Sequence, residues 1–357
     1  MSYLRNFWYC AAWGPELSRK PLARTLLDEK VVLYRKEAGG LIALGNVCPH
    51  RFAPLDQGKL HGDVLACPYH GLQFGENGGC VHNPHGDLIP ATLRVKSYPI
   101  VERYGAAWMW MGDPALADET AIPDFNEHSD PAFRSIYSHI PIQGSYELVS
   151  DNLLDLSHTQ YLHAVLTHDH DPEARSEFRI EQDGNTITTI QNHLNVSQTG
   201  FQRFIWPAGP QRSDNWGGIR WQPPANMRLK IQMAPVGGTP QKDGQIAWGA
   251  ELVTPETATT CHYFWSFARN FRLDEPGLDE ALRQAIESVF TNEDGAMIAK
   301  VQSNMGTETD LMAMRPVILP TDKAAVLARR VIRNLLRKEA AVAIPESGPQ
   351  VPKTEEV

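Results

Sequence analysis

Short apolar runs separated by glycine-rich turns make up the N-terminal part of the chain. The segment KVVLYRKEAGGLIALG predicts two strands joined by a turn at Glu37–Gly40, and SYPIVERYGAAWMWMGDP predicts two more around Arg103–Gly105. Closely spaced strands and turns of this kind favour an antiparallel β domain. We therefore predict such a domain over residues 1–115.

The pattern changes after Asp113-Pro114, where a polar, proline-punctuated stretch predicts a linker over residues 116–134. A second domain with mixed helices and strands is expected over residues 135–344, which makes the fold class α+β. The proline- and glutamate-rich residues 345–357 predict a disordered tail. Within the second domain, helical periodicity covers residues 145–164, 276–302 and 322–341, and strand-like alternation dominates residues 176–270.

Composition fits this two-domain interpretation and narrows the function. The chain has 357 residues, of which 42% are hydrophobic and 21% charged, as in ordinary soluble proteins. Its net charge of −9 argues against a nucleic-acid partner, which would need a basic surface. No apolar run is long enough to span a membrane and no secretory signal is evident. Five cysteines, few and odd in number, indicate metal or structural thiols in a cytoplasmic protein rather than a disulfide framework.

Two short loops carry the first candidate chemistry. Cys48-Pro49-His50 is followed, after sixteen residues, by Cys67-Pro68-Tyr69-His70. Each loop offers one thiolate and one imidazole, and a Rieske [2Fe–2S] cluster requires two cysteines and two histidines. Zinc is the alternative, since two cysteines and two histidines also suit tetrahedral zinc. Zinc fingers, however, pair cysteine with cysteine and histidine with histidine along the sequence, whereas each loop here mixes them. Tyr69 is either an ordinary core aromatic or a hydrogen-bonding partner of a cluster ligand.

A second group of candidate ligands lies in the segment DNLLDLSHTQYLH, which contains His158 and ends at His163. Two histidines and a carboxylate on one face of Fe(II) leave positions open for O₂ and substrate. On a regular helix, residues five apart point about 140° away from each other, so the helix must be distorted or end between the two histidines. The alternative is a pair of polar histidines on a partly buried helix.

These motifs resemble the Rieske oxygenase family, whose cluster pattern is preserved as CPHRFAPL and CPYHGL and whose iron pattern is preserved as DNLLDLSHTQYLH. The resemblance implies a Rieske domain followed by a helix-grip-like catalytic domain with a curved antiparallel sheet. It implies that Cys48 and Cys67 bind one iron of the cluster, and that His50 and His70 bind the other. It also implies that His158 and His163 bind a mononuclear iron.

The resemblance extends to the acidic and amide residues around that iron. It gives Asp155 a bridging role, receiving electrons from the cluster of a neighbouring subunit, and an ionised aspartate there could fix the tautomer of a histidine ligand. Asn152 is expected to face the metal as a weak or distant fourth group. The family places its third ligand in a C-terminal helix, where Asp294 is the candidate and Glu293 the runner-up; two solvated helix charges are the alternative.

Longer stretches, including NFWYCAAW and LVTPETATTCHYFWSFARNF, are similar to the vanillate and dicamba O-demethylase branch. The resemblance implies a homotrimeric monooxygenase, the oxygenase component of a multicomponent system, which removes a methyl group from a methoxylated aromatic acid and releases formaldehyde. Hydroxylation, N-dealkylation or aryl-ether cleavage of another aromatic or xenobiotic compound stays open. A non-catalytic Rieske electron carrier is disfavoured, because such carriers are much shorter and lack the histidine pair.

The electron source and the pocket complete the expectations. The chain shows no ferredoxin-type cysteine run and no dinucleotide-binding fingerprint. Electrons from NADH or NADPH must therefore arrive through a separate reductase, with or without a ferredoxin. The sheet face around Arg228 and Lys230 could offer a cation to a substrate carboxylate, or could be solvated. Candidate pocket residues, which could equally be packing residues, are Trp206, Leu229, Ile231, Glu251, His262, Phe264 and Trp265.

Overall fold

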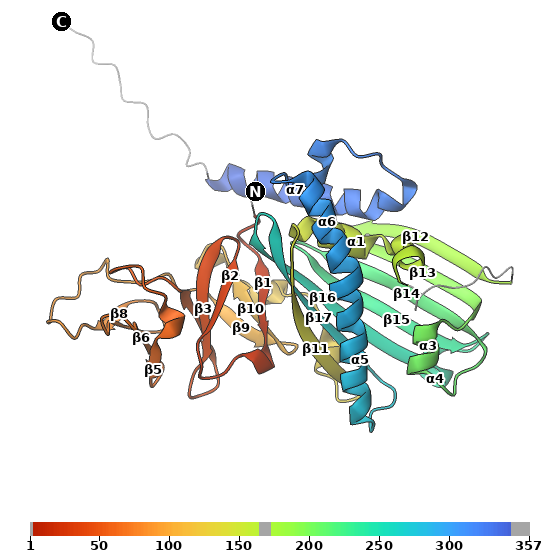
Figure 1. Cartoon of the computed structure of the whole chain (residues 1–357), viewed down its shortest axis with the longest axis horizontal. Helices are drawn as coiled ribbons and strands as arrows, with labels where there is room; N and C mark the ends of the chain where they lie inside the picture. The colour runs from red at the N-terminus through yellow and green to blue at the C-terminus, as the bar shows by residue number, and fades with distance from the viewer. Residues whose placement is uncertain (1–2, 164–172, 344–357) are drawn as a thin grey trace, which may run out of the picture.

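The computed structural model describes residues 3–163 and 173–343, and it has two β-rich lobes (Figure 1). The expected tail at 345–357 lies outside the described residues. Three small antiparallel sheets form the N-terminal lobe, as the turn pattern predicted, and the sheet that follows Cys48 lies at the far end of the molecule (Figure 1). The sheets are β1 (Trp8–Trp13), β10 (Ala106–Trp110) and β9 (Ile100–Arg103); β2 (Leu22–Leu26), β3 (Glu29–Arg35) and β4 (Leu41–Gly45); and β5 (Lys59–His61), β6 (Val64–Ala66), β7 (Gln73–Phe74) and β8 (Cys80–His82).

One seven-stranded antiparallel sheet forms the second lobe, in the order β11-β17-β16-β15-β14-β13-β12. Apart from the edge strand β11, its strands follow one another in sequence as a meander. The predicted curved antiparallel sheet with helices is confirmed. The strands are β11 (Arg134–Ile142), β12 (Arg175–Asp183), β13 (Thr186–Ser197), β14 (Arg212–Gln222), β15 (Asn226–Pro235), β16 (Gln245–Thr257) and β17 (Thr260–Arg269).

Helices cover one face of this sheet. The predicted helix at 276–302 is a single rod made of α5, a π-helical turn and α6, and it crosses in front of the sheet (Figure 1). Its apolar residues Leu278, Leu282 and Ile298 are buried in the main core. No helix in the described part of the chain is long and apolar enough to cross a membrane. The helical elements are α1 (Tyr146–Leu154), α2 (Thr159–Leu162), α3 (Gly200–Ile205), α4 (Pro240–Asp243), α5 (Pro276–Val289), the π-helical turn η8 (Phe290–Asp294), α6 (Gly295–Met305) and α7 (Lys323–Ala343).

The two faces of the sheet belong to different cores, as the alternation of side chains along a strand requires. On β17, Tyr263 and Trp265 enter the core beneath the helices, whereas Phe264 packs with Trp13 and Trp108 of the N-terminal lobe. Along β17, one face of the sheet is thus covered by the helices and the other packs against Trp13 and Trp108, although the main core also includes residues of the N-terminal lobe such as Tyr9 and Leu26.

The segment predicted as a linker, 116–134, is a packed connection. Ile122 and Phe125 are buried between the lobes, and Phe125 stacks on Trp108. Glu127 is 2% exposed and pairs with Arg228 at 2.6 Å. The polar composition of residues 116–134 gave no indication that the segment packs between the lobes, because only these few of its side chains face inward. The exact boundaries of the domains remain a prediction.

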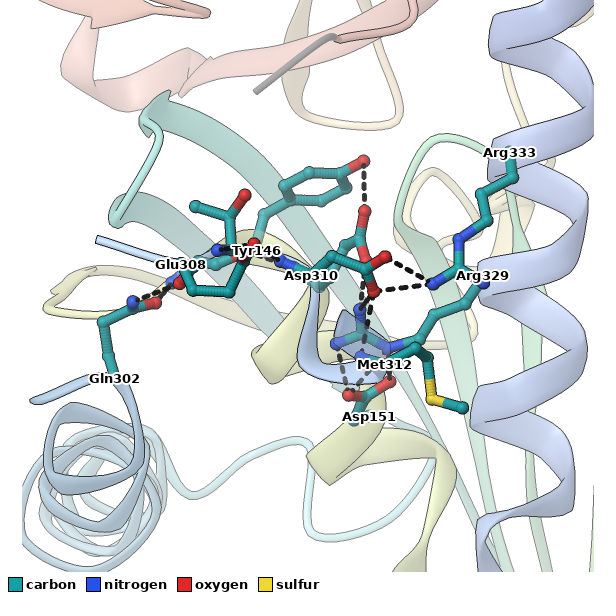
Figure 2. A network of polar contacts seen from close by, with 11 residues as sticks. Tyr146, Asp151, Gln302, Glu308, Asp310, Met312, Arg329 and Arg333 are labelled. Carbon is teal, nitrogen blue, oxygen red and sulfur yellow. Dashed lines mark hydrogen bonds and ion pairs between the residues drawn. The ribbon is translucent and has the colours of Figure 1, made fainter. Parts of the chain in front are cut away.

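A buried ion-pair network ties α7 to α1 (Figure 2). Arg329 on α7 has a 4% exposed side chain and donates to both carboxylate oxygens of Asp151, and its other terminal nitrogen contacts Glu147. Nearer the surface, Arg333 donates to Asp310 at 2.6 Å. The network fixes the helix that precedes the histidine pair.

Candidate metal centres and substrate cavity

The two Cys-His loops are tight turns closed by their own backbone. The Phe52 amide donates to the Cys48 carbonyl at 2.9 Å, and the Gly71 amide donates to the Cys67 carbonyl at 3.1 Å. Gly71 has a φ of +71°, in the left-handed region that glycine adopts without strain. The loops thus place their four polar side chains at fixed positions.

Within this pair of loops the thiols point inward and the imidazoles outward. Cys48 is 1% exposed and Cys67 is 4% exposed, and burial raises the pKa of Cys48, which also contacts Cys67. The rings of His50 and His70 are 4.5 Å apart nearer the surface. Two adjacent thiols and two adjacent imidazoles are the donor set that a Rieske cluster needs, one pair for each iron. Tyr69 is not a core aromatic, since it is 62% exposed with its ring 4.0 Å from that of His70.

The histidine segment breaks its helix, as the spacing predicted. Helix α1 ends at Leu154, and the Asp155 carboxylate accepts from the Ser157 amide at 2.9 Å and so caps a 3₁₀ turn over Leu156–His158. The short helix α2 then ends at Leu162, and the backbone of His163 that follows is extended. The break turns the two imidazole rings toward each other, with centroids 5.2 Å apart.

Three side chains converge at this break. Nε2 of His158 lies 3.3 Å from Oδ1 of Asp294, and Nε2 of His163 lies 3.4 Å from Oδ2. The ligand atoms of all three residues lie within 4.8 Å of one another. Ligand atoms about 2 Å from a metal stand roughly 3 Å apart in adjacent positions, so the set fits one ion. Burial lowers the pKa of His158, but its contacts with Asp294 and the Asp155 carbonyl raise the pKa by more.

A π-helical turn decides between the two candidate carboxylates. Asp294 is 3% exposed and ends η8 facing both histidines, while Glu293 accepts a hydrogen bond on the outer side of His163, at 2.7 Å from Nδ1. Single π turns inside α-helices are frequent at functional sites. Glu293 therefore orients His163 instead of joining the three converging atoms. The sequence indicated Glu293 as a ligand or a solvated helix charge and missed this orienting role, because two adjacent carboxylates give no signal of different roles.

The other two predicted residues have more indirect contacts. Asn152 donates from Nδ2 to Oδ1 of Asp294 at 3.1 Å. The group that bonds Nδ1 of His158 is the backbone carbonyl of Asp155, at 2.5 Å, so the expected contact from the Asp155 carboxylate is wrong. That carboxylate is occupied by the Ser157 amide, because the helix break needs a cap at this position.

A cavity of about 570 Å³ opens beside the three converging residues, between the helices and the sheet. Leu229, Ile231, Glu251 and Trp265 line it, as predicted. Its other apolar lining includes Leu153, Leu156, Phe201, Ile205, Ile219, Ala285, Ile286 and Phe290.

Four residues named in the pocket hypothesis lie elsewhere. His262 bonds the Thr25 carbonyl at 3.0 Å, and Phe264 and Arg228 also face the N-terminal lobe. Trp206 packs against the main core at the end of α3. Strand alternation shows that neighbours face opposite ways, but it does not show which set faces the helices.

Comparison with known proteins agrees with this geometry. The model of the Rieske [2Fe–2S] domain matches residues 7–99, and that of the vanillate O-demethylase oxygenase C-terminal domain matches residues 142–338. Dicamba O-demethylase, oxygenase component, from Stenotrophomonas maltophilia is 40% identical over 96% of this chain and 100% of its own. Chloroacetanilide N-alkylformylase, oxygenase component, from Rhizorhabdus wittichii is 36% identical over 94% of this chain and 97% of its own.

Solved structures give the same result. A crystal structure of dicamba monooxygenase with non-haem iron and dicamba superposes with a TM-score of 0.83 and 38% identity, over 96% of this chain and 100% of that chain. The predicted family is confirmed. The chain therefore belongs to the Rieske non-haem iron oxygenases, in the branch of the vanillate and dicamba O-demethylases, and is an oxygenase component of that family.

Proposed function

We propose that this oxygenase component carries out oxidative demethylation of a methoxylated aromatic compound. The observation that carries the proposal is the convergence of His158, His163 and Asp294 at the wall of a large apolar cavity. In this proposal these residues hold the mononuclear iron, and Cys48, His50, Cys67 and His70 hold the [2Fe–2S] cluster. Two histidines and one carboxylate leave Fe(II) with open positions at which O₂ is activated.

The remaining residues of the site position groups and exclude water. Glu293 accepts from Nδ1–H of His163 and thereby fixes the tautomer in which Nε2 presents its lone pair to the metal. Asn152 holds one oxygen of Asp294. The apolar lining lets an aromatic ring displace water beside the histidines. One O₂, two electrons and two protons convert the methoxy group into a hydroxyl group, formaldehyde and water.

Electrons come from NADH or NADPH through a separate reductase, with or without a ferredoxin. We propose a homotrimer in which the cluster of one subunit serves the iron of the next, with Asp155 as the bridge. The separation in Figure 1 supports this, because the sheet β5–β8 lies at the far end of the N-terminal lobe, away from α1 in the second lobe. N-dealkylation is the second candidate, since the relative from Rhizorhabdus wittichii is named for that reaction.

Formaldehyde release tests the reaction. Purified protein with a reductase, NADH and a panel of O- and N-methyl aromatics should release formaldehyde in step with the demethylated product. A His163→Ala variant should keep the visible spectrum of the cluster and lose turnover. Undiminished turnover in that variant would remove the mononuclear iron from the mechanism, and no formaldehyde from any methyl substrate would rule out demethylation.

A further inference from the structure

The carboxyl group of Glu251, on β16, is a buried polar group in the wall of the substrate cavity. The side chain is 3% exposed and lines the cavity. The Tyr263 hydroxyl donates to Oε2 at 2.5 Å. The second oxygen, Oε1, has no hydrogen-bond partner among the described residues. One half of this carboxyl group is thus committed to the protein, and the other half is available to a ligand.

The packing around Glu251 holds the carboxyl in place. Its cross-strand neighbours are Met227 and Trp265, both buried in the main core. A Cβ atom at Gly249 would lie 2.5 Å from Oε1, so any other residue there would collide with the carboxyl. Glycine inside a strand often marks such a close approach. Glycine at position 249 thus leaves room for Oε1, while the buried neighbours and the hydrogen bond from Tyr263 hold the carboxyl group.

Glu251 is largely uncharged at neutral pH. Burial raises its pKa to about 8, although the hydrogen bond from Tyr263 works in the opposite direction. No basic side chain forms an ion pair with it in residues 3–163 and 173–343. Since Oε2 already accepts from Tyr263, the proton resides on Oε1. The group then offers the cavity a neutral hydrogen-bond donor.

The cations near the cavity do not serve Glu251 or a ligand beside it. Lys230 is among the residues that line the cavity, but it alternates with Leu229 and Ile231 on β15, so its side chain extends from the opposite face of the sheet, as that of Arg228 does. Arg228 stacks over Trp248 at 4.2 Å and pairs with Glu127.

Other titratable groups of the cavity wall are also engaged. They are His158, His163, Glu293 and Asp294 of the metal site, and His193, whose Nδ1 lies 2.9 Å from the Ser176 hydroxyl. Since the side chain of Lys230 extends from the other face of the sheet, a carboxylate entering this apolar space would lose its hydration without gaining a cationic partner from the described lining residues, which is costly.

We infer that Glu251 determines substrate specificity, by donating a hydrogen bond from Oε1 to a neutral oxygen acceptor on the substrate. The preferred substrate is then a methoxylated aromatic amide, ketone or ester, and not the aromatic acid that the family resemblance suggested. This rests on the proposed function only in placing the substrate in this cavity. The role of Glu251 is tested by ligand binding, which is measured without turnover. A failure of this inference can therefore be distinguished from a failure of the proposed demethylation.

Binding of matched ligands to the iron-loaded protein under anaerobic conditions tests the inference. The three isomers of methoxybenzamide, methoxybenzoate and methoxytoluene are titrated by calorimetry at pH 7. The wild-type protein should bind at least one benzamide about tenfold more tightly than the benzoate of the same substitution pattern. Equal or tighter binding of the benzoates, or no binding of any benzamide, overturns the inference.

Variants assign the effect to the carboxyl group. Glu251→Leu should weaken binding of that benzamide about tenfold and leave the matching methoxytoluene within threefold. Glu251→Gln keeps a donor, so its benzamide affinity should stay within threefold of wild type, which keeps the test decisive if the leucine variant fails to fold. Glu181→Leu, exposed on β12, is the control. An equal loss for both ligands in Glu251→Leu, or a tenfold loss in Glu251→Gln, contradicts hydrogen-bond donation by Glu251.

Discussion

Removal of the Arg329 guanidinium should destabilise the protein far more than removal of an exposed arginine on the same helix. Arg329→Met keeps most of the apolar volume but leaves Asp151 and Glu147 without their cation. Loss of one partner from a buried ion pair typically costs about 3–5 kcal/mol. Burial already raises the pKa of both carboxyl groups, against the opposing effect of Arg329. Without Arg329 we expect one of them to take up a proton at neutral pH.

The assay is thermal unfolding of the metal-loaded protein, in which such a loss lowers the melting temperature of a 357-residue chain by about 4–7 °C. Arg333→Met is the matched control, because the Arg333 and Asp310 side chains are 42% and 43% exposed and such pairs contribute about 0–1 kcal/mol. The triple variant Arg329→Met, Asp151→Asn, Glu147→Gln should recover most of the loss, since no unpaired charge remains. Equal melting temperatures for the two single variants, or no recovery in the triple variant, would refute the reasoning.

Three further predictions address acid stability and the metal sites. Burial lowers the pKa of His128 to about 4 and of His139 to about 3, so the unfolded chain binds more protons than the folded protein below pH 6.5. The melting temperature should therefore fall as the pH drops from 6.5 toward 4, and it should fall less steeply in a His139→Gln variant. The same pH dependence of the melting temperature in the wild type and the variant would contradict this prediction. Glu293→Gln should weaken iron binding about 10- to 100-fold in a chelator competition and leave the cluster spectrum intact, whereas an unchanged affinity would deny that Glu293 orients His163. Asp155→Asn should keep both metals and slow reduction-dependent single turnover, and an unchanged single-turnover rate would exclude the bridging role.

Local motifs predicted which side chains lie together, because the spacing within each motif is short. Cys48 and His50 share one turn, and the five-residue step from His158 to His163 itself required the helix break that the structure shows. Asp294 lies more than a hundred residues downstream, so only resemblance selected it. The pocket prediction mixed residues of both sheet faces, such as Trp265 and Phe264. Which face the helices cover depends on the tertiary packing of the sheet, and the alternation along a single strand does not show it.

The π-helical turn η8 has a consequence for how related chains can vary in length. It adds one residue to the rod between Phe290 and Asp294, and Gln302, further along α6, accepts from the Ser145 amide at 3.0 Å. Deleting one residue in η8 would restore regular helix but rotate one end of the rod by about 100° against the other. Either Asp294 would no longer contact His158 and His163, or Gln302 on α6 would no longer bond the Ser145 amide at the start of α1. The exposed residues Thr291 and Asn292 of this turn can therefore be substituted in related chains that bind the iron, whereas a single insertion or deletion in the turn is incompatible with the iron site.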